Sequence, residues 1–286
     1  MLKKGQKLIR LNKYFQDMMN KIIDSHCHLD FDDFKNDRKE VIDKAIKTGI
    51  SNLLTISVDL EKFRNILNIA KQYPDIIWCT TGIHPNKVKS KISEREFEEI
   101  FFNIENNILN NKNEVIGVGE TGLDYFRSNK NKINQQKSFD LHLEVSGKTG
   151  CPVVVHMRSA EKDTTDILNK KVKHYNSKGL IHCFTSTKEF AKIALDNDFF
   201  ISFAGIITFK NSYDLKKVVE YIPNDKILVE TDSPYLSPEP LRGKRNIPSN
   251  IIHTIKSIAE IKNMAEEEVV SKTNENFFNL FSNILK

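Results

Sequence analysis

The sequence predicts an α/β fold, a single-domain (β/α)8 (TIM) barrel. Eight short apolar segments rich in β-branched residues alternate with eight segments of helical periodicity. Such strands fit a parallel sheet that helices cover, and eight strand–helix units close a barrel. A doubly wound open sheet is the alternative, and it is disfavoured because no glycine-rich loop follows the first strand.

Each predicted strand is a short apolar run that ends in polar or turn-forming residues. The strands are predicted at residues 22–26, 53–56, 76–80, 114–120, 152–156, 180–184, 199–203 and 227–230. The segments between them repeat apolar residues at helical spacing, as amphipathic helices do. The helices are predicted at residues 37–47, 63–70, 93–110, 133–148, 160–175, 187–196, 212–221 and from 251 to the end of the chain. Gly49 and Pro74 end the first two, because neither residue type continues a helix well.

Length and composition favour one soluble globular domain with a substantial core. The chain has 286 residues, of which 39% are hydrophobic and 28% charged, and one barrel reaches this length. The formal charge of +5 permits a phosphate-bearing partner without requiring one. No apolar run approaches the roughly 20 residues of a membrane helix, so we expect no membrane partner, and we expect a monomer.

The first twenty residues stand outside this pattern. We expect residues 1–20 to be a basic extension, disordered or preceding the true start at Met18 or Met19, and residues 21–286 to form the barrel. The extension lacks the apolar core of a secretory signal, while a targeting presequence stays open. Four widely spaced cysteines (Cys27, Cys79, Cys151 and Cys183) adjoin apolar runs, which predicts buried free thiols and a cytoplasmic location.

Two histidines end the first predicted strand. His26 and His28 are separated by one residue, and in a strand such residues point to the same face. They are therefore placed to hold one metal ion together, although a pair of surface or core histidines is an open alternative for so short a pattern.

More ligand-type residues recur at the ends of later strands, where (β/α)8 enzymes place their chemistry. They are His84, Glu120, His156, His182 and Asp232. Five of the eight histidines lie at such positions, whereas His142, His174 and His253 fall in helical segments. This distribution predicts a metal centre.

The residue types suit two divalent ions. Two histidines with Asp232 leave open positions on one ion, as a catalytic site requires, and Glu120 is able to bridge to a second ion held by His156 and His182. Paired ions suit phosphodiester hydrolysis. Imidazole and carboxylate accept Zn, Mn or Fe and, more weakly, Mg, so the sequence does not select the ion.

The chain resembles the TatD family of metal-dependent deoxyribonucleases, within the amidohydrolase-like barrels. The matching motifs span about residues 22–250 in order; they are Asp24-Ser25-His26-Cys27-His28-Leu29, Gly82-Ile83-His84-Pro85, Gly119-Glu120-Thr121-Gly122-Leu123-Asp124-Tyr125, Pro152-Val153-Val154-Val155-His156, His182-Cys183-Phe184, Glu230-Thr231-Asp232-Ser233-Pro234-Tyr235-Leu236 and Leu241-Arg242-Gly243-Lys244-Arg245-Asn246. The resemblance implies one metal at His26, His28, Glu120 and Asp232, and another at Glu120, His156 and His182.

The chain departs from the family pattern at several positions outside the predicted ligands. Ser159 replaces an acid, Thr185-Ser186 replaces Ser-Gly, Asn86 stands where a second histidine is common, and Ile247 replaces a glutamate. These departures put substrate preference in doubt more than hydrolysis.

Substrate contacts are predicted around the mouth of the barrel. Arg242, Lys244 and Arg245 lie just beyond the eighth strand and suit phosphate contact. Arg158 suits bidentate phosphate binding, and Tyr125 and Phe126, which follow the fourth strand, are placed to stack on a base of a single strand. A solvated basic loop, a rim salt bridge and rim packing are the respective alternatives. We also expect His84 to contact substrate.

The leading functional hypothesis is a metal-dependent hydrolase that cleaves DNA phosphodiesters as an exonuclease, with Asp232 and Glu120 as catalytic residues. The expected nucleic-acid substrate is single-stranded DNA or DNA ends. The alternative is an ester or amide hydrolase on the same barrel, such as an aminoacyl-tRNA deacylase. A metal-bearing binding protein is a third possibility, and the open coordination positions argue against it.

Overall fold

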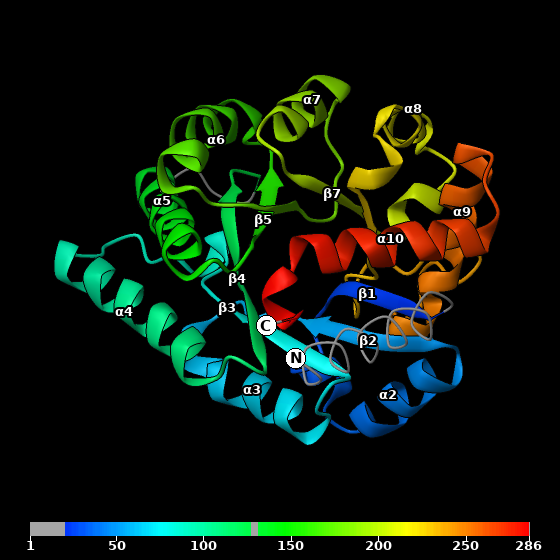
Figure 1. Cartoon of the computed structure of the whole chain (residues 1–286), viewed down its shortest axis with the longest axis horizontal. Coiled ribbons are helices and arrows are strands. Elements are labelled where there is room, and N and C mark those ends of the chain that lie inside the picture. The colour runs from blue at the N-terminus through cyan, green and yellow to red at the C-terminus, as the bar shows by residue number, and fades with distance from the viewer. Residues whose placement is uncertain (1–20, 127–130, 286) are drawn as a thin grey trace, which may run out of the picture.

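A computed structural model describes residues 21–126 and 131–285 and confirms the predicted barrel (Figure 1). One sheet contains eight parallel strands in the order β1 to β8. They are β1 (Ile22–Cys27), β2 (Ile50–Thr55), β3 (Ile77–Thr81), β4 (Val115–Asp124), β5 (Val153–Arg158), β6 (Gly179–Ile181), β7 (Phe200–Phe203) and β8 (Ile227–Val229). A parallel bridge between Cys27 and Ser233 joins β1 to the segment after β8. The order excludes the doubly wound sheet, in which strand order reverses.

Helices follow the strands and surround the sheet (Figure 1). They are α2 (Arg38–Lys47), α3 (Phe63–Gln72), α4 (Glu94–Asn110), α5 (Lys132–Thr149), α6 (Glu161–Tyr175), α7 (Lys188–Asp196), α8 (Tyr213–Tyr221), α9 (Ile251–Lys262) and α10 (Glu266–Leu280). Their buried faces pack on the outward-facing strand residues in one large apolar cluster. No helix of the described residues is both long and apolar enough to span a membrane.

The inside of the barrel has a core of its own, which α10 closes. Inward-facing residues such as Ile23, Leu54 and Leu228 form a second cluster with Phe277 and Phe281 of α10. Figure 1 shows α10 lying across the barrel. Asn274 and Asn276 of α10 donate to the carbonyl oxygens of Lys21 and Ile227, where β1 and β8 begin. The helix therefore covers the N-terminal end of the barrel and leaves the C-terminal end for the site.

The structure corrects three predicted boundaries. The last helical segment is two helices, because Asn263 takes a left-handed backbone conformation (φ 53°) that ends α9. Strand β4 continues beyond Glu120 to Asp124, past a register irregularity between Val118 and Thr121. Strand β6 ends at Ile181, and the chain leaves the sheet where Cys183 has a positive φ. His182 therefore follows the strand instead of lying in it.

The predicted extension, residues 1–20, lies outside the described residues. The cysteines follow the prediction: all four are free, with Cys27, Cys79 and Cys151 buried and Cys183 half-buried.

Candidate metal centre

The six predicted metal ligands lie together at the C-terminal end of the barrel. His26 lies in β1, Glu120 in β4 and His156 in β5, whereas the other three follow strand ends. His26, His28, Glu120 and His182 are buried, and the Asp232 side chain is 13% exposed. Residues that are far apart in the sequence thus meet because parallel strands present their carboxyl ends at one face.

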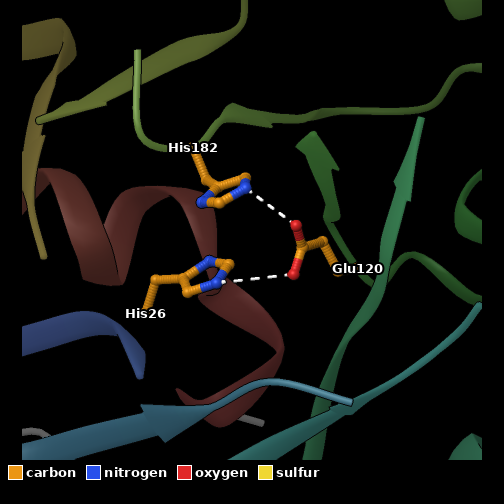
Figure 2. Close-up of side chains that lie close together, drawn as sticks. All are labelled: His26, Glu120 and His182. Atoms are coloured by element: carbon orange, nitrogen blue, oxygen red, sulfur yellow. Dashed lines mark ion pairs between the residues drawn. The ribbon is translucent and has the colours of Figure 1, made fainter. Parts of the chain in front are cut away.

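Glu120 stands at the middle of this group, and its two oxygens face different histidines (Figure 2). Oε1 lies 2.8 Å from Nε2 of His182 and 3.0 Å from Nδ1 of His156. Oε2 lies 3.6 Å from Nε2 of His26 and 3.9 Å from Nε2 of His28. The two oxygens of this one carboxylate therefore face imidazoles on two sides of the group.

The first group of donor atoms contains His26, His28 and Asp232. Oδ1 of Asp232 lies 3.5 Å from Nε2 of His26 and 3.3 Å from Nε2 of His28, and the two nitrogens are 3.2 Å apart. Nδ1 of His28 faces the Ile56 carbonyl oxygen at 3.2 Å. If that nitrogen donates, the lone pair of the neutral ring lies on Nε2 and points into the centre.

The second group contains His156 and His182 around Oε1 of Glu120. Nδ1 of His156 and Nε2 of His182 are 3.3 Å apart. His84 also approaches, with Nε2 3.4 Å from Oε1 of Glu120. Its Nδ1 accepts the backbone N–H of Asn86 at 3.0 Å, so the neutral ring carries its proton on Nε2. His84 is therefore a hydrogen-bond donor in this centre and has no lone pair for a metal.

Charge and burial oppose each other in the centre. Burial acts to raise the pKa of the Glu120 carboxyl, but His182 and His84 outweigh it and hold that pKa well below its usual range. Burial acts to lower the pKa of His182, yet Glu120 and Glu230 raise it well above the usual value. Burial, reinforced by His182, holds the pKa of His26 far below normal. The low pKa of Glu120 favours its carboxylate form, which is the form that binds a divalent ion.

The donor set fits divalent metal ions. Three trios of side chains, His26–Glu120–His182, His26–His28–Asp232 and His84–Glu120–His156, each bring three nitrogen or oxygen atoms within 4.8 Å of one another. The last trio is the weakest candidate, because Nδ1 of His84 already accepts the Asn86 N–H. Imidazole nitrogen with carboxylate oxygen is a set that Zn, Mn and Fe accept. Nδ1 of His26 is buried without a hydrogen-bond partner among the described residues, so that ring is held mainly by packing.

Buried acids that the sequence reasoning left without a role hold two of the histidines. Oε1 of Glu230 lies 3.3 Å from Nδ1 of His182 and accepts the Cys183 N–H at 3.0 Å. Oδ2 of Asp124 lies 3.3 Å from Nε2 of His156. A carboxylate on the far nitrogen fixes the orientation of a ligating ring. The signal for both was present, since each acid directly follows or ends an apolar strand.

The loop that carries Asp232 is fixed by two buried residues. Asp24 accepts hydrogen bonds from the Thr231 N–H at 2.9 Å and from its hydroxyl at 2.6 Å. Asn246 donates through Nδ2 to the Thr231 and Tyr235 carbonyl oxygens at 2.9 and 2.7 Å. Asp232 thus sits between two anchored positions, which holds its carboxylate toward His26 and His28.

The predicted substrate residues differ in whether their charged groups already have partners in the protein. Arg242 and Lys244 are exposed, and the Arg242 guanidinium lies 4.3 Å from the centre of the Phe209 ring. Arg245 is engaged elsewhere: it donates to both carboxylate oxygens of Asp37, at 3.0 Å for Oδ1. Contact between Arg245 and a substrate phosphate would therefore compete with the ion pair between Arg245 and Asp37.

Arg158 and Tyr125 lie on the β4–β5 side. The Arg158 guanidinium stacks 3.8 Å from the centre of the Phe126 ring. The Tyr125 hydroxyl donates to Asp163 at 2.8 Å and accepts from Gln136 at 2.9 Å. Phe126, which is 64% exposed, is the more available ring for stacking.

Asn86, one departure from the family pattern, has a structural role. Its Nδ2 donates to Oδ2 of Asp124 at 2.9 Å, the same oxygen that faces His156. Asn86 therefore helps to orient the acid that orients His156. Ser186, another departure, donates through its hydroxyl to Oε1 of Glu161 at 2.9 Å.

Comparisons with known proteins agree with this geometry. Residues 23–282 match the family described as TatD related DNase. A relative from Buchnera aphidicola, named as an uncharacterized metal-dependent hydrolase, is 38% identical over 267 residues, which cover 91% of this chain and 96% of the relative. The similarly named YcfH of Escherichia coli is 35% identical over 263 residues, covering 91% and 95%.

Solved structures show the same fold. The TatD homologue YJJV of Escherichia coli superposes with a TM-score of 0.83 at 23% identity, covering 93% of this chain and 99% of that one. A TatD family hydrolase from Entamoeba histolytica gives a TM-score of 0.78 at 26% identity, covering 92% and 98%.

Proposed function

We propose that this chain, which belongs to the TatD family of metal-dependent hydrolases, cleaves phosphodiester bonds of DNA from a strand end. The observation that carries the proposal is the position of Glu120, whose two oxygens face separate sets of imidazoles. Two ions sharing one carboxylate suit an in-line displacement at phosphorus, where both the attacking and the leaving oxygen need stabilisation.

The residues divide into two sides of one centre. His26, His28 and Asp232 would hold one divalent ion and His156 with His182 the other, with Glu120 between them. Bound divalent ions lower the pKa of water and neutralise charge on a phosphate. Glu230 and Asp124 keep the rings of His182 and His156 turned inward.

Asp232 is the best-placed proton acceptor. It is the least buried carboxylate of the centre, 13% exposed against 3% for Glu120, so it borders the space through which water and substrate enter. A carboxylate there is able to take a proton from the attacking water within hydrogen-bond reach. Glu120, buried among histidines, serves to fix the geometry of the centre.

Cationic side chains at the mouth support an anionic polymer as substrate. Arg158, Arg242 and Lys244 are exposed around the C-terminal end of the barrel. Lysine and arginine supply sequence-independent affinity for phosphates. An aminoacyl-tRNA is also an anion, so charge alone does not separate the two substrates, and the direct assay has to do so.

The test is hydrolysis of single-stranded DNA labelled at either end, with Mg, Mn or Zn supplied in turn. Stepwise release of mononucleotides is expected, and the label that disappears first gives the polarity. Glu120→Ala prepared in parallel controls for contaminating nuclease. Internal fragments would contradict cleavage from an end. Deacylation of aminoacyl-tRNA with intact DNA would replace the proposal with the ester-hydrolase alternative.

A further inference from the structure

Exposed aromatic rings stand on two opposite sides of the metal centre. Tyr235 follows β8, next to β1, and is 52% exposed; Phe126 follows β4 and is 64% exposed. The strands follow one another around the barrel in numerical order, so β4 and β5 lie across the mouth from β8 and β1. The donor atoms of the centre lie between these two sides.

The Tyr235 ring is held in place next to the first group of donor atoms. Phe31 stacks on His28 with ring centres 4.5 Å apart and 15° between planes, and Tyr235 packs edge-on against Phe31 at 6.0 Å. The Tyr235 N–H donates to the Asp232 carbonyl oxygen at 2.9 Å, and its own carbonyl accepts from Asn246. The ring therefore keeps a fixed position relative to Asp232.

The Phe126 ring is fixed next to the second group. The Arg158 guanidinium covers one face at 3.8 Å, and Arg158 lies two residues beyond His156 in β5. The Phe126 N–H donates to Oδ1 of Asp124 at 3.1 Å, the acid that faces His156. Both rings are thus anchored to residues that adjoin the proposed ligands, and both expose large apolar surface to water.

We propose that Tyr235 and Phe126 are stacking subsites for the two nucleotides that flank the scissile phosphate, and that Arg158 contacts the backbone on the Phe126 side. This inference rests on the proposed cleavage of DNA, and it names the side chains that would hold the two bases of a single strand. Every base offers a face for stacking, which suits a sequence-tolerant enzyme. The bases of a duplex are already stacked and paired, so a duplex has to open before its nucleotides reach both rings.

The test measures kcat and KM on a short single-stranded oligodeoxynucleotide. Tyr235→Ala and Phe126→Ala are each expected to raise KM about 5- to 150-fold, the range for loss of one base–aromatic contact. Tyr235→Phe keeps the ring and should raise KM far less than Tyr235→Ala does. Phe102→Ala, which removes a 56% exposed ring from α4, is the matched control and should change nothing.

An oligonucleotide with one abasic residue separates stacking from structural damage. When the missing base is the one that Tyr235 contacts, Tyr235→Ala should no longer raise KM, while Phe126→Ala still should. Equal losses on intact and abasic substrates, or an unchanged KM in both alanine variants, would overturn the subsites without touching the proposed hydrolysis.

Failure of the proposed function is distinguished by a binding measurement. If the wild type cleaves no DNA, fluorescence anisotropy of the same labelled oligonucleotide decides the matter. Binding that weakens in both alanine variants and survives in Tyr235→Phe would support the subsites as a binding surface. Binding that is the same in all variants would refute them.

Discussion

Substitution of Glu230 is a sharp test of the metal centre. Glu230 is not a proposed metal ligand, yet it accepts hydrogen bonds from two groups on the side of the centre that contains His156 and His182. One oxygen, Oε1, faces Nδ1 of His182 and the Cys183 N–H. Glu230→Ala leaves both donors buried without this acceptor, and each such group costs about 1–3 kcal/mol. Loss of a carboxylate behind a ligating histidine also lowers metal affinity about 10- to 100-fold.

Glu230→Gln separates these effects. Both donors point at the same oxygen, so the amide carbonyl is able to accept both while the charge is lost. We expect the glutamine variant to keep most of its metal affinity and its melting temperature, and the alanine variant to lose affinity at one ion only. Glu260→Ala, an exposed site on α9, serves as the control.

Calorimetric titration of Zn or Mn into chelator-treated protein measures the affinities, and thermal unfolding of the same samples measures folding. Wild-type affinity of Glu230→Ala for both ions would refute this role of Glu230. An equal fall of both affinities in a fully folded variant would refute it too, because Glu230 contacts only the His182 side.

Five further outcomes are expected. Glu120→Ala should lose both ions, as elemental analysis of the purified variant would show, because each of its oxygens faces a different group. Asp232→Asn should collapse kcat in the DNA assay while the protein stays folded. Arg242→Ala should reduce the salt dependence of DNA binding by about one unit of slope. Arg245→Ala should leave that slope nearly unchanged. It should lower the free energy of unfolding in denaturant by at most about 1 kcal/mol, because the ion pair between Arg245 and Asp37 is exposed to solvent. Chelation should lower the melting temperature, and adding back the ion should restore it, because an ion that binds only the folded chain stabilises it.

The barrel and the grouping of its ligands were predictable because both follow from local patterns. Apolar runs mark strands, and parallel strands present their ends at one face, so His26, Glu120 and His156 had to meet if the barrel closed. The end of β6 was predicted less accurately, and His182 was placed inside that strand. The chain leaves the sheet where Cys183 has a positive φ, and the residue types around Cys183 do not predict this conformation.

The supporting contacts were not predictable, because they depend on side-chain directions across distant segments. Asp124 and Glu230 are ordinary strand-end acids until the fold turns them toward His156 and His182. Arg245 belongs to a basic motif, but the fold places Asp37 against it. Residue type and spacing predict which groups reach the mouth, whereas the partner each one takes there is decided by tertiary structure.

The barrel closes where β1 meets the segment after β8, and this closure determines when during synthesis the metal centre can form. Asp24 and Thr231, whose hydrogen bonds fix the Asp232 loop, are 207 residues apart, and Asn246, which completes that anchor, lies later still. A chain emerging from the ribosome carries His26 and His28 long before Asp232 exists. Nascent fragments therefore present isolated histidines and no assembled centre, so hydrolysis begins only after nearly the whole chain has been synthesised.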